Sequence, residues 1–503
     1  MTQTADPQRG ARGGLRQVLA RAGAALPHPF LLFGYFFAAL AVVSSVLGWC
    51  GTTVTVPGHP APSPVRPMLS GAGVRYFLDN FVSNFIGFPP LGIVLVTLMA
   101  VGVAERTGFL RAAVLSGLRR VPARLMPVAV TLLAAQGHVM GDASMVVLPP
   151  LCALAFQAVG RKPVAGALGG FAAAAGGYAG GFLVGAFDAN ISSLTASVTP
   201  KTSGAVSSVT MNYFFQAASG LVLPIVTAYV LVRFIEPRLP AYDGGTEQPP
   251  GLSDVERRGL RRALAALGGY LVVVLASWLI PGGPLRGASD GLVSSPFTKN
   301  VVTFVALGFL LAGVVHGRAT GTVRRAADVP AMMADSLRAM AGYVVVAFAA
   351  GQFIGMFTWT NLGELLSVRG AALITWAHAG GLTAFVALIL LTFAFSLLIS
   401  SGSALWTLMA PVVVPLFAGL NFHPALAQAA FRVGDSVAHP ISPMNPYVYV
   451  LHDTVRRYDP GATVAGLFAR LGVFVLPMLV AWTIVFAAFF AFGVPFGPGV
   501  PSP

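Results

Sequence analysis

Two stretches of this sequence decide its fold: Ile399-Ser-Ser-Gly-Ser-Ala-Leu-Trp406, and Phe431-Arg-Val-Gly-Asp435 with the nearby His439-Pro-Ile-Ser-Pro-Met-Asn-Pro446. They place an arginine, an aspartate, small hydroxyl side chains and several prolines among residues that are otherwise apolar. Ionisable side chains and irregular backbone are costly inside a membrane, and they occur there where they line a solute or ion pathway. The two stretches therefore predict a polytopic transporter.

The composition is that of an integral membrane protein. Of the 503 residues, 56% are hydrophobic and 10% are charged, whereas a soluble domain carries about 25% charged residues. Uncharged runs of about 20 residues, the length that crosses a bilayer, recur along the chain. Examples are Phe30–Trp49, Met211–Leu231 and Val473–Gly493.

The basic residues indicate topology. The net charge of +14 comes from arginines spread between apolar spans, and they do not form the single basic stripe typical of a nucleic-acid partner. The two cysteines, Cys50 and Cys152, indicate neither a disulfide framework nor a thiolate metal site.

The positive-inside rule predicts how the chain crosses the bilayer. We expect a cytoplasmic tail at 1–28, a first half at 29–235, a cytoplasmic linker at 236–262 and a second half at 263–503, with the N-terminus inside and the C-terminus outside. About nine transmembrane helices are expected. They cover about Pro29–Trp49, Phe85–Ala104, Pro163–Ser193, Asn212–Ile235, Ala263–Ile280, Val301–Val315, Leu337–Thr358, Pro424–Leu451 and Leu471–Phe492.

Two further apolar blocks are expected to form re-entrant hairpins. Met126–Val159 divides at Gly141-Asp142 into halves of about 15 residues, each too short to cross. Basic residues flank it on both sides, so it is expected to open inward, whereas Leu382–Leu420, turning at Ser400–Ser403, is expected to open outward. The third and eighth spans, interrupted by glycines or prolines, are expected to be broken helices.

The hairpins also suggest an internal repeat. Aligning Gly141-Asp-Ala143 with Gly402-Ser-Ala404 at a constant offset pairs Pro150 with Pro411, Phe156 with Phe417 and Pro163 with Pro424. Hairpins that open to opposite sides are typical of inverted repeats around a midplane site. The predicted fold class is an all-α polytopic membrane protein with two opposed re-entrant hairpins and inverted repeats.

The hairpin tips are the first candidates for substrate or ion binding. Gly402 permits a tight turn, Ser401 and Ser403 offer hydroxyls, and the helix that follows can direct its free amides at a carboxylate. The serines are also expected to cap that helix. Trp406, one turn further, either stacks on an aromatic ligand or packs. At the first tip, Gly141 and Asp142 are the corresponding candidates.

Charged residues within the spans are the second group of candidates. Arg432 and Asp435 lie three residues apart on one helix face, so they are expected to pair with each other. Arg432 would clamp an anionic substrate, and Asp435 would carry a proton or bind a cation. No metal site is assigned, but sodium at Asp435 and Asn445 stays open as an alternative.

Asp188 is the leading candidate for a proton carrier. It lies in the glycine-rich third span and has no basic residue within one helical turn. Sodium coordination together with Asn190 is the alternative. His138 and His439 are interpreted as packing residues and left out of the site.

Two motifs of other mechanisms are absent from the sequence. It contains no phosphate-binding glycine loop and no His-Glu-x-x-His. We therefore expect secondary transport, no enzymatic activity and no cofactor, with H⁺ or Na⁺ as the coupling ion. The alternatives are a sodium-coupled carboxylate carrier of similar architecture and, less well supported, an intramembrane enzyme with Asp188 and Asp435 as an acid pair.

The sequence resembles the AbgT family of transporters, named for p-aminobenzoyl-glutamate transport. The resemblance is carried by Ser401–Trp406, Ala410–Pro415, Phe431–Ser436 and Ile441–Pro446, and in the first half by Asp142–Leu151, Gly160–Gly166, Gly176–Tyr178 and Gly185–Asp188. It implies a homodimer in the bacterial inner (cytoplasmic) membrane, each subunit divided between a scaffold and a transport core. It also implies small anionic aromatic substrates, p-aminobenzoyl-glutamate or related folate-pathway metabolites, and proton-driven efflux of sulfonamide antimetabolites.

Matching motif positions carries functional residues over from the family. They are Asp188, Ser403, Trp406, Pro424, Arg432, Asp435 and Pro443. From their chemistry alone, the two prolines are predicted only to interrupt helices.

Overall fold

The computed structural model describes residues 29–55, 62–118, 121–200, 205–240, 242, 252–286, 295–339, 341–365, 368–369, 381–399 and 401–502. The predicted tail at 1–28, part of the predicted linker and Ser400 of the predicted turn lie outside the described residues. The described chain is mostly helical, with one short antiparallel ribbon in which β1 (Thr53–Val54) pairs with β2 (Ser63–Pro64).

The first half contains a scaffold segment, a divided block and a broken helix. Its elements are α2 (Pro29–Trp49), α3 (Gly71–Ile86), α4 (Pro89–Arg106), α5 (Phe109–Leu118), α6 (Met126–Ala135), η1 (Gln136–Met140), α7 (Ala143–Ala158), α8 (Pro163–Gly176), α9 (Ala186–Val198), α10 (Tyr213–Val230), η3 (Leu231–Ile235) and η4 (Glu236–Arg238).

The second half has the same kinds of element. They are α11 (Asp254–Leu279), α12 (Pro296–Lys299), α13 (Val301–Thr320), α14 (Asp328–Ala339), α15 (Ala341–Trp359), α17 (Gly381–Ser396), α18 (Gly402–Gly419), α19 (Pro424–Ala438), η5 (His439–Ile441), α20 (Tyr447–Arg456) and α21 (Val464–Ala491).

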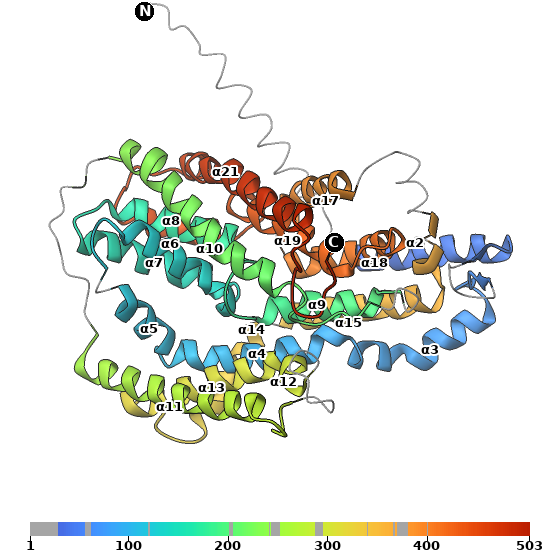
Figure 1. Cartoon of the computed structure of the whole chain (residues 1–503), viewed down its shortest axis with the longest axis horizontal. Coiled ribbons are helices and arrows are strands. Elements are labelled where there is room, and N and C mark those ends of the chain that lie inside the picture. Colours follow the sequence, from blue (N-terminus) through green and yellow to red (C-terminus); the bar gives the residue numbers. More distant parts are fainter. Residues whose placement is uncertain are drawn as a thin grey trace, which may run out of the picture.

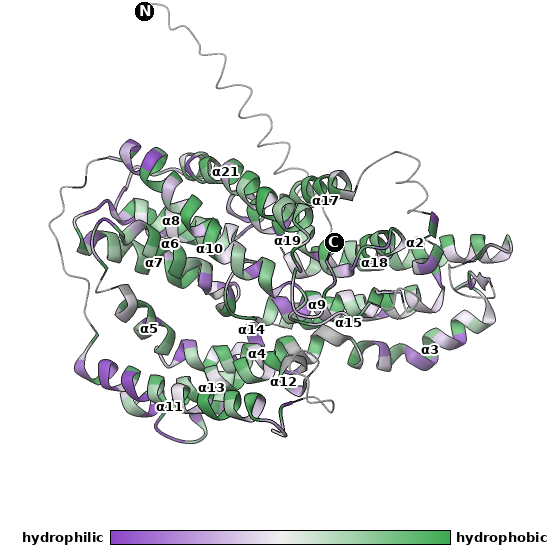
Figure 2. Ribbon diagram, viewed as in Figure 1, coloured by the Kyte–Doolittle hydropathy of each residue, from purple (hydrophilic) through white to green (hydrophobic). Residues whose placement is uncertain are grey.

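Most helices are apolar along their length. Within the described residues, five helical segments are both long and apolar enough to cross a membrane: Tyr213–Arg238, α11, α13, α18 and α21. In Figure 2 most helices are green, and several helix ends are hydrophilic purple, as at the start of α11. That start is nine residues earlier than expected, at Asp254 instead of Ala263, because Ser253 and Glu256 form a reciprocal cap.

Both predicted divided blocks are divided in the structure. The first has a 3-10 turn after α6 and then Gly141, whose φ of 59° suits glycine, before α7 begins. The second ends α17 at Ser396 and begins α18 at Gly402. Whether the two blocks are re-entrant in a membrane stays a prediction.

The two predicted broken helices are also confirmed. Residues 177–185 separate α8 from α9, and η5 with residues 442–446 separates α19 from α20. Both breaks free backbone groups from helical hydrogen bonds, so that these groups are available for polar contacts.

Helix ends recur at the spacing from Gly141 to Gly402, which is 261 residues. At this spacing the end of α6 falls on the end of α17, the end of α7 on the end of α18, the start of α8 on the start of α19, and the start of α9 on the start of α20. The matching boundaries support the predicted internal repeat. Its inversion across a membrane stays a prediction.

The helices pack in two groups that meet around α9. One group places α4 against α13 and α14, and α15 against α2 and α3. The other pairs α7 with α8, α17 with α19, and α10 with α21. In Figure 1 the first group fills the lower and right-hand parts of the view, and α4 contacts α9 of the other group. This arrangement brings the two helix breaks and the two divided blocks to the middle of the molecule.

Candidate functional site

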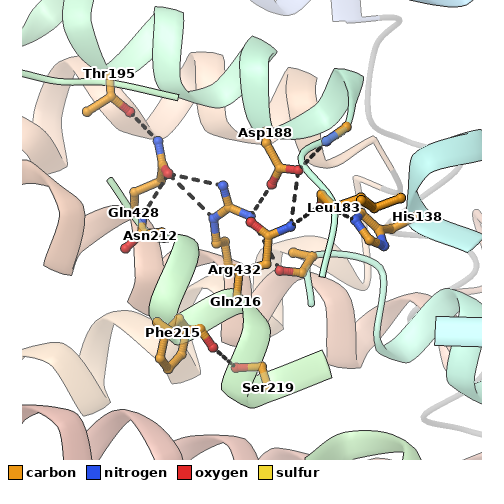
Figure 3. A network of polar contacts seen from close by, with 12 residues as sticks. His138, Leu183, Asp188, Thr195, Asn212, Phe215, Gln216, Ser219, Gln428 and Arg432 are labelled. Carbon is orange, nitrogen blue, oxygen red and sulfur yellow. Dashed lines mark hydrogen bonds and ion pairs between the residues drawn. The ribbon is translucent and has the colours of Figure 1, made fainter. Parts of the chain in front are cut away.

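A buried ion pair links the two halves at the centre of the protein. The Arg432 guanidinium on α19 donates through Nη1 to Asp188 Oδ1 of α9 at 2.6 Å. Both side chains are 1% exposed. Burying either charge alone would cost several kcal/mol. The ion pair and its hydrogen bonds offset the cost of burying both charges. Figure 3 shows the pair within its polar network.

Neutral amides complete the environment of the ion pair. The Gln428 side-chain oxygen accepts from Arg432 Nε at 3.4 Å and Nη2 at 3.3 Å, and from Asn212 at 2.8 Å. Asp188 Oδ2 accepts from the Gly185 backbone N–H at 2.7 Å and from Gln216 at 3.2 Å. Asp188 is the third residue of α9, so the positive end of the helix dipole also favours its charge.

The predicted pairing of Arg432 with Asp435 is wrong. The arginine side chain reaches across to the break between α8 and α9, where Asp188 offers a carboxylate at a helix start. The prediction used only neighbours along the helix, and Asp188 lies 244 residues away in the sequence. Both Asp188 oxygens accept protein hydrogen bonds, so this conformation leaves Asp188 engaged, neither an unpaired proton acceptor nor an evident sodium ligand with Asn190.

Asp435 forms a second buried polar group one turn further along α19. Its Oδ1 accepts from the Ser396 hydroxyl at 2.7 Å and lies 3.6 Å from His439 Nε2. Its Oδ2, the Ser436 hydroxyl and both His439 ring nitrogens have no hydrogen-bond partner within the described part of the chain. A Cβ built on Gly402 would lie 2.3 Å from Asp435 Oδ2. Gly402 therefore lets the second tip pack directly on this carboxylate.

A cavity of about 720 Å³ lies between the two tips. The first tip contributes Gly141 and Asp142 to its wall, and the second contributes residues 401–404. Tyr178, Phe187, Asn190, His439, Asn445 and Tyr447 also line it. Arg432, Asp188 and Asp435 are not on this wall; they are buried behind it.

The second tip is built as predicted at its helix start. The Ser401 hydroxyl accepts from the Ala404 backbone N–H, which confirms the capping role. Ser403 accepts from the Asn190 side chain of α9 at 2.7 Å. Trp406 is fully buried and donates to Ile191 O at 3.1 Å and Thr195 Oγ1 at 3.0 Å. In this conformation the indole packs between helices and does not face the cavity.

The first tip presents a carboxylate to the cavity. Asp142 Oδ1 accepts from the Tyr178 hydroxyl and Oδ2 from the Tyr447 hydroxyl, each at 3.1 Å. Gly141, with its positive φ, leaves the turn without a side chain next to Tyr178.

The prolines and Asn445 act on the backbone. Pro424 is the first residue of α19, where its missing N–H costs nothing. Pro443 lies in the break before α20, and its carbonyl accepts from the Tyr449 hydroxyl at 3.4 Å. Asn445 donates to His439 O and accepts from the Tyr447 backbone N–H, both at 3.0 Å. The Asn445 amide therefore shapes the break, and no described cluster of three or more His, Cys, Asp or Glu side chains suits a metal.

Sequence reasoning missed several members of the site. Nothing in the local sequence distinguishes four neutral residues in apolar or irregular segments: Ser396, Gln216, Gln428 and Tyr447. Tyr178 lies in the Gly176–Tyr178 motif, but the motif gives its side chain no role. The interpretation of His138 as a packing residue is confirmed, whereas His439 belongs to the site. His439 lies beside Asp435 and lines the cavity. His138 contacts Ala135 O and Leu183 O through its two ring nitrogens, at 3.1 and 2.6 Å.

An apolar helical protein whose broken helices enclose polar groups beside a cavity has the architecture of a multi-pass membrane transporter. The model of the AbgT transporter family matches residues 14–503. The p-aminobenzoyl-glutamate transport protein of Escherichia coli (strain K12) is 35% identical over 504 residues, which cover 99% of each chain.

Solved structures give the same result. The crystal structure of the Alcanivorax borkumensis YdaH transporter, described as having an unusual topology, matches with a TM-score of 0.88 and 33% identity over 94% of this chain and 100% of that one. Neisseria gonorrhoeae MtrF, from a class of antimetabolite efflux pumps, matches with a TM-score of 0.89 and 32% identity over 96% of this chain and 99% of that one. This chain belongs to the AbgT family, and it is a transporter and not an enzyme.

Proposed function

We propose that this transporter moves p-aminobenzoyl-glutamate or related folate-pathway metabolites, exports sulfonamide-type antimetabolites, and is driven by the proton gradient. The observation that carries the proposal is the cavity between the tips, whose volume of about 720 Å³ lies within the range that holds drug-sized ligands. The names of the E. coli relative and of MtrF support the substrate class.

The second tip is the proposed contact for a substrate carboxylate. Ser401 already accepts from the Ala404 N–H, which leaves the amides of Gly402 and Ser403 at the free end of α18. Amides at a helix start and nearby hydroxyls favour an anion. Arg432, predicted to clamp the substrate, is engaged with Asp188 in this conformation, so in our proposal it stabilises the site from behind the cavity wall.

Asp435 is the proposed proton carrier. Its Oδ2 has no partner among the described residues, and it faces the backbone of the second tip at Gly402. Protonation would remove a negative charge from beside the place proposed for the substrate carboxylate, which couples the two binding events. Sodium at Asp435 and Asn445 is the alternative coupling scheme.

The test is flux of radiolabelled p-aminobenzoyl-glutamate into proteoliposomes under an imposed proton or sodium gradient. We expect a proton gradient to drive accumulation in the native protein, and Asp435→Asn to abolish the dependence on that gradient. Asp188→Ala and Arg432→Ala should abolish flux. Accumulation driven by sodium alone would refute proton coupling, and unchanged flux in all three variants would refute the site.

The homodimer and the membrane orientation remain predictions. Cys50, at the end of α2, is exposed, whereas Cys152 is buried. With an N-terminus inside, Cys50 should react with an impermeant maleimide applied from outside the cell. Cross-linking in the membrane should yield a band of twice the mass of one chain.

A further inference from the structure

We propose that Asp142 at the first tip recognises the amine end of the substrate, so that it selects solutes with a hydrogen-bond donor at the 4-position of the phenyl ring, as in a 4-aminophenyl group. This inference rests on the proposed function, and it adds which part of the substrate each tip binds. The carboxylate end would lie at the second tip and the amine end at the first.

The Asp142 carboxylate is held in place but not saturated. One phenol hydroxyl donates to each oxygen, from Tyr178 and from Tyr447, at 3.1 Å. A carboxylate oxygen accepts about two hydrogen bonds, so each oxygen retains a site for another donor. Asp142 is exposed to the cavity, and both tyrosines line the cavity with it.

No described cation neutralises this carboxylate. Among the described residues Asp142 forms no ion pair. Of the other charged side chains on the cavity wall, Glu105 and Arg106 belong to α4, and Arg106 is 3.5 Å from Asp335. An acceptor with spare capacity therefore faces the solute, and donors are the groups it favours.

The walls between the tips suit an aromatic ring. The rings of Tyr178 and Phe187 lie edge to face with centroids 5.1 Å apart. A Cβ on Gly141 would lie 3.9 Å from the Tyr178 hydroxyl, and one on Gly402 would lie 3.1 Å from the Phe187 ring. The two aromatic side chains thus connect one tip to the other. A flat solute with a donor at one end and a carboxylate at the other matches this order of groups.

The experiment compares solutes that differ at one position. Native protein and variants would be reconstituted, and the half-saturating concentrations of p-aminobenzoyl-glutamate, 4-hydroxybenzoyl-glutamate and benzoyl-glutamate would be measured by flux. The first two analogues can donate to Asp142, and the third cannot. We expect native protein to discriminate against benzoyl-glutamate by about tenfold, the factor typical of a hydrogen bond to a charged acceptor.

The variants separate recognition from folding, because the ratio between two solutes does not depend on the amount of folded protein. Asp142→Ala removes both acceptor oxygens and should reduce the tenfold ratio to near unity. Tyr447→Phe keeps the carboxylate and should retain the ratio. Ser401→Ala, at the other tip, should weaken all three solutes alike and leave the ratio unchanged.

Each outcome decides something. A native protein that moves all three solutes equally well overturns the inference and leaves the transport proposal standing. Discrimination that persists in Asp142→Ala also overturns it. A native protein that moves none of the three overturns the proposed function and the inference with it.

Discussion

Removing the charge of Arg432 should strongly destabilise the protein. Arg432→Met retains much of the side-chain volume but leaves the Asp188 carboxylate, 1% exposed, without a counter-charge. The Gly185 and Gln216 donors remain, yet hydrogen bonds alone do not offset a buried charge. Breaking such a pair costs about 3–5 kcal/mol, so we expect a loss of that size in the free energy of unfolding.

The double variant Arg432→Met/Asp188→Asn removes both charges. Its loss in the free energy of unfolding should be smaller than the sum of the two single losses by at least about 2 kcal/mol, because no buried charge is left without a partner. The matched control is Arg470→Met, which breaks a half-exposed pair with Asp459 at 3.4 Å and should cost at most about 1 kcal/mol. Urea titration in detergent micelles followed by tryptophan fluorescence gives the free energies.

The same variants distinguish a structural pair from a functional one. If the pair only supports the fold, flux should return when the double variant regains stability. We expect part of the lost stability to return in the double variant and flux to stay abolished, because the break between α8 and α9 is held through Arg432. If Arg432→Met lowers the free energy of unfolding no more than Arg470→Met does, the reasoning about the buried Arg432–Asp188 pair is refuted.

Three further predictions concern single positions. Trp406→Phe removes a donor to two acceptors on α9 and should lower the free energy of unfolding by about 1–2 kcal/mol in the same titration. Gly402→Ala would place a Cβ 2.3 Å from the carboxylate behind the tip and should abolish flux, whereas Gly472→Ala, with open space around its Cβ, should not. Backbone N–H groups of Arg325 and Arg324, each at 2.7 Å, lower the pKa of Asp328. Their stabilisation of the start of α14 should be present at neutral pH and lost as the pH falls to about 3. The hydrogen-exchange protection there, measured against the intrinsic exchange rate at each pH, should therefore fall on acidification in native protein but not in Asp328→Asn.

The sequence predicts correctly those elements whose signals are local. Pro163 and Pro424 start α8 and α19, since proline suits the first turn of a helix. Gly141 and Gly402 stand at the tips, where a turn or a close approach excludes a side chain. The helices α3 and α14 were missed, because their charged residues interrupt the apolar runs on which spans are recognised.

The site itself depends on contacts that no local pattern contains. The site residues predicted from the sequence do lie together at the centre. Most of the contacts predicted for them are wrong, or were not predicted at all. Arg432 meets Asp188 across 244 residues, and Asp142 meets Tyr447 across 305. Such pairs follow from how the two halves pack, and a single sequence read along the chain carries no signal for that packing.

The repeat explains why each tip is tied to the opposite half. Ser403 is held by Asn190 of α9, and Asp142 is held by Tyr447 of α20. At the repeat spacing Asp142 corresponds to Ser403, and α9 corresponds to α20, so the two ties join equivalent elements, although Asn190 and Tyr447 are not equivalent positions.

The helix contacts follow the same rule, because α9 packs on α18 while α20 packs on α7. Tyr178 and His439 are also equivalent positions, and their rings touch with centroids 5.7 Å apart. Equivalent residues that contact one another lie at the symmetry axis that relates them. We therefore expect a solute that displaces one tip to pull on the broken helix of the other half, so that occupation of the cavity moves both halves together.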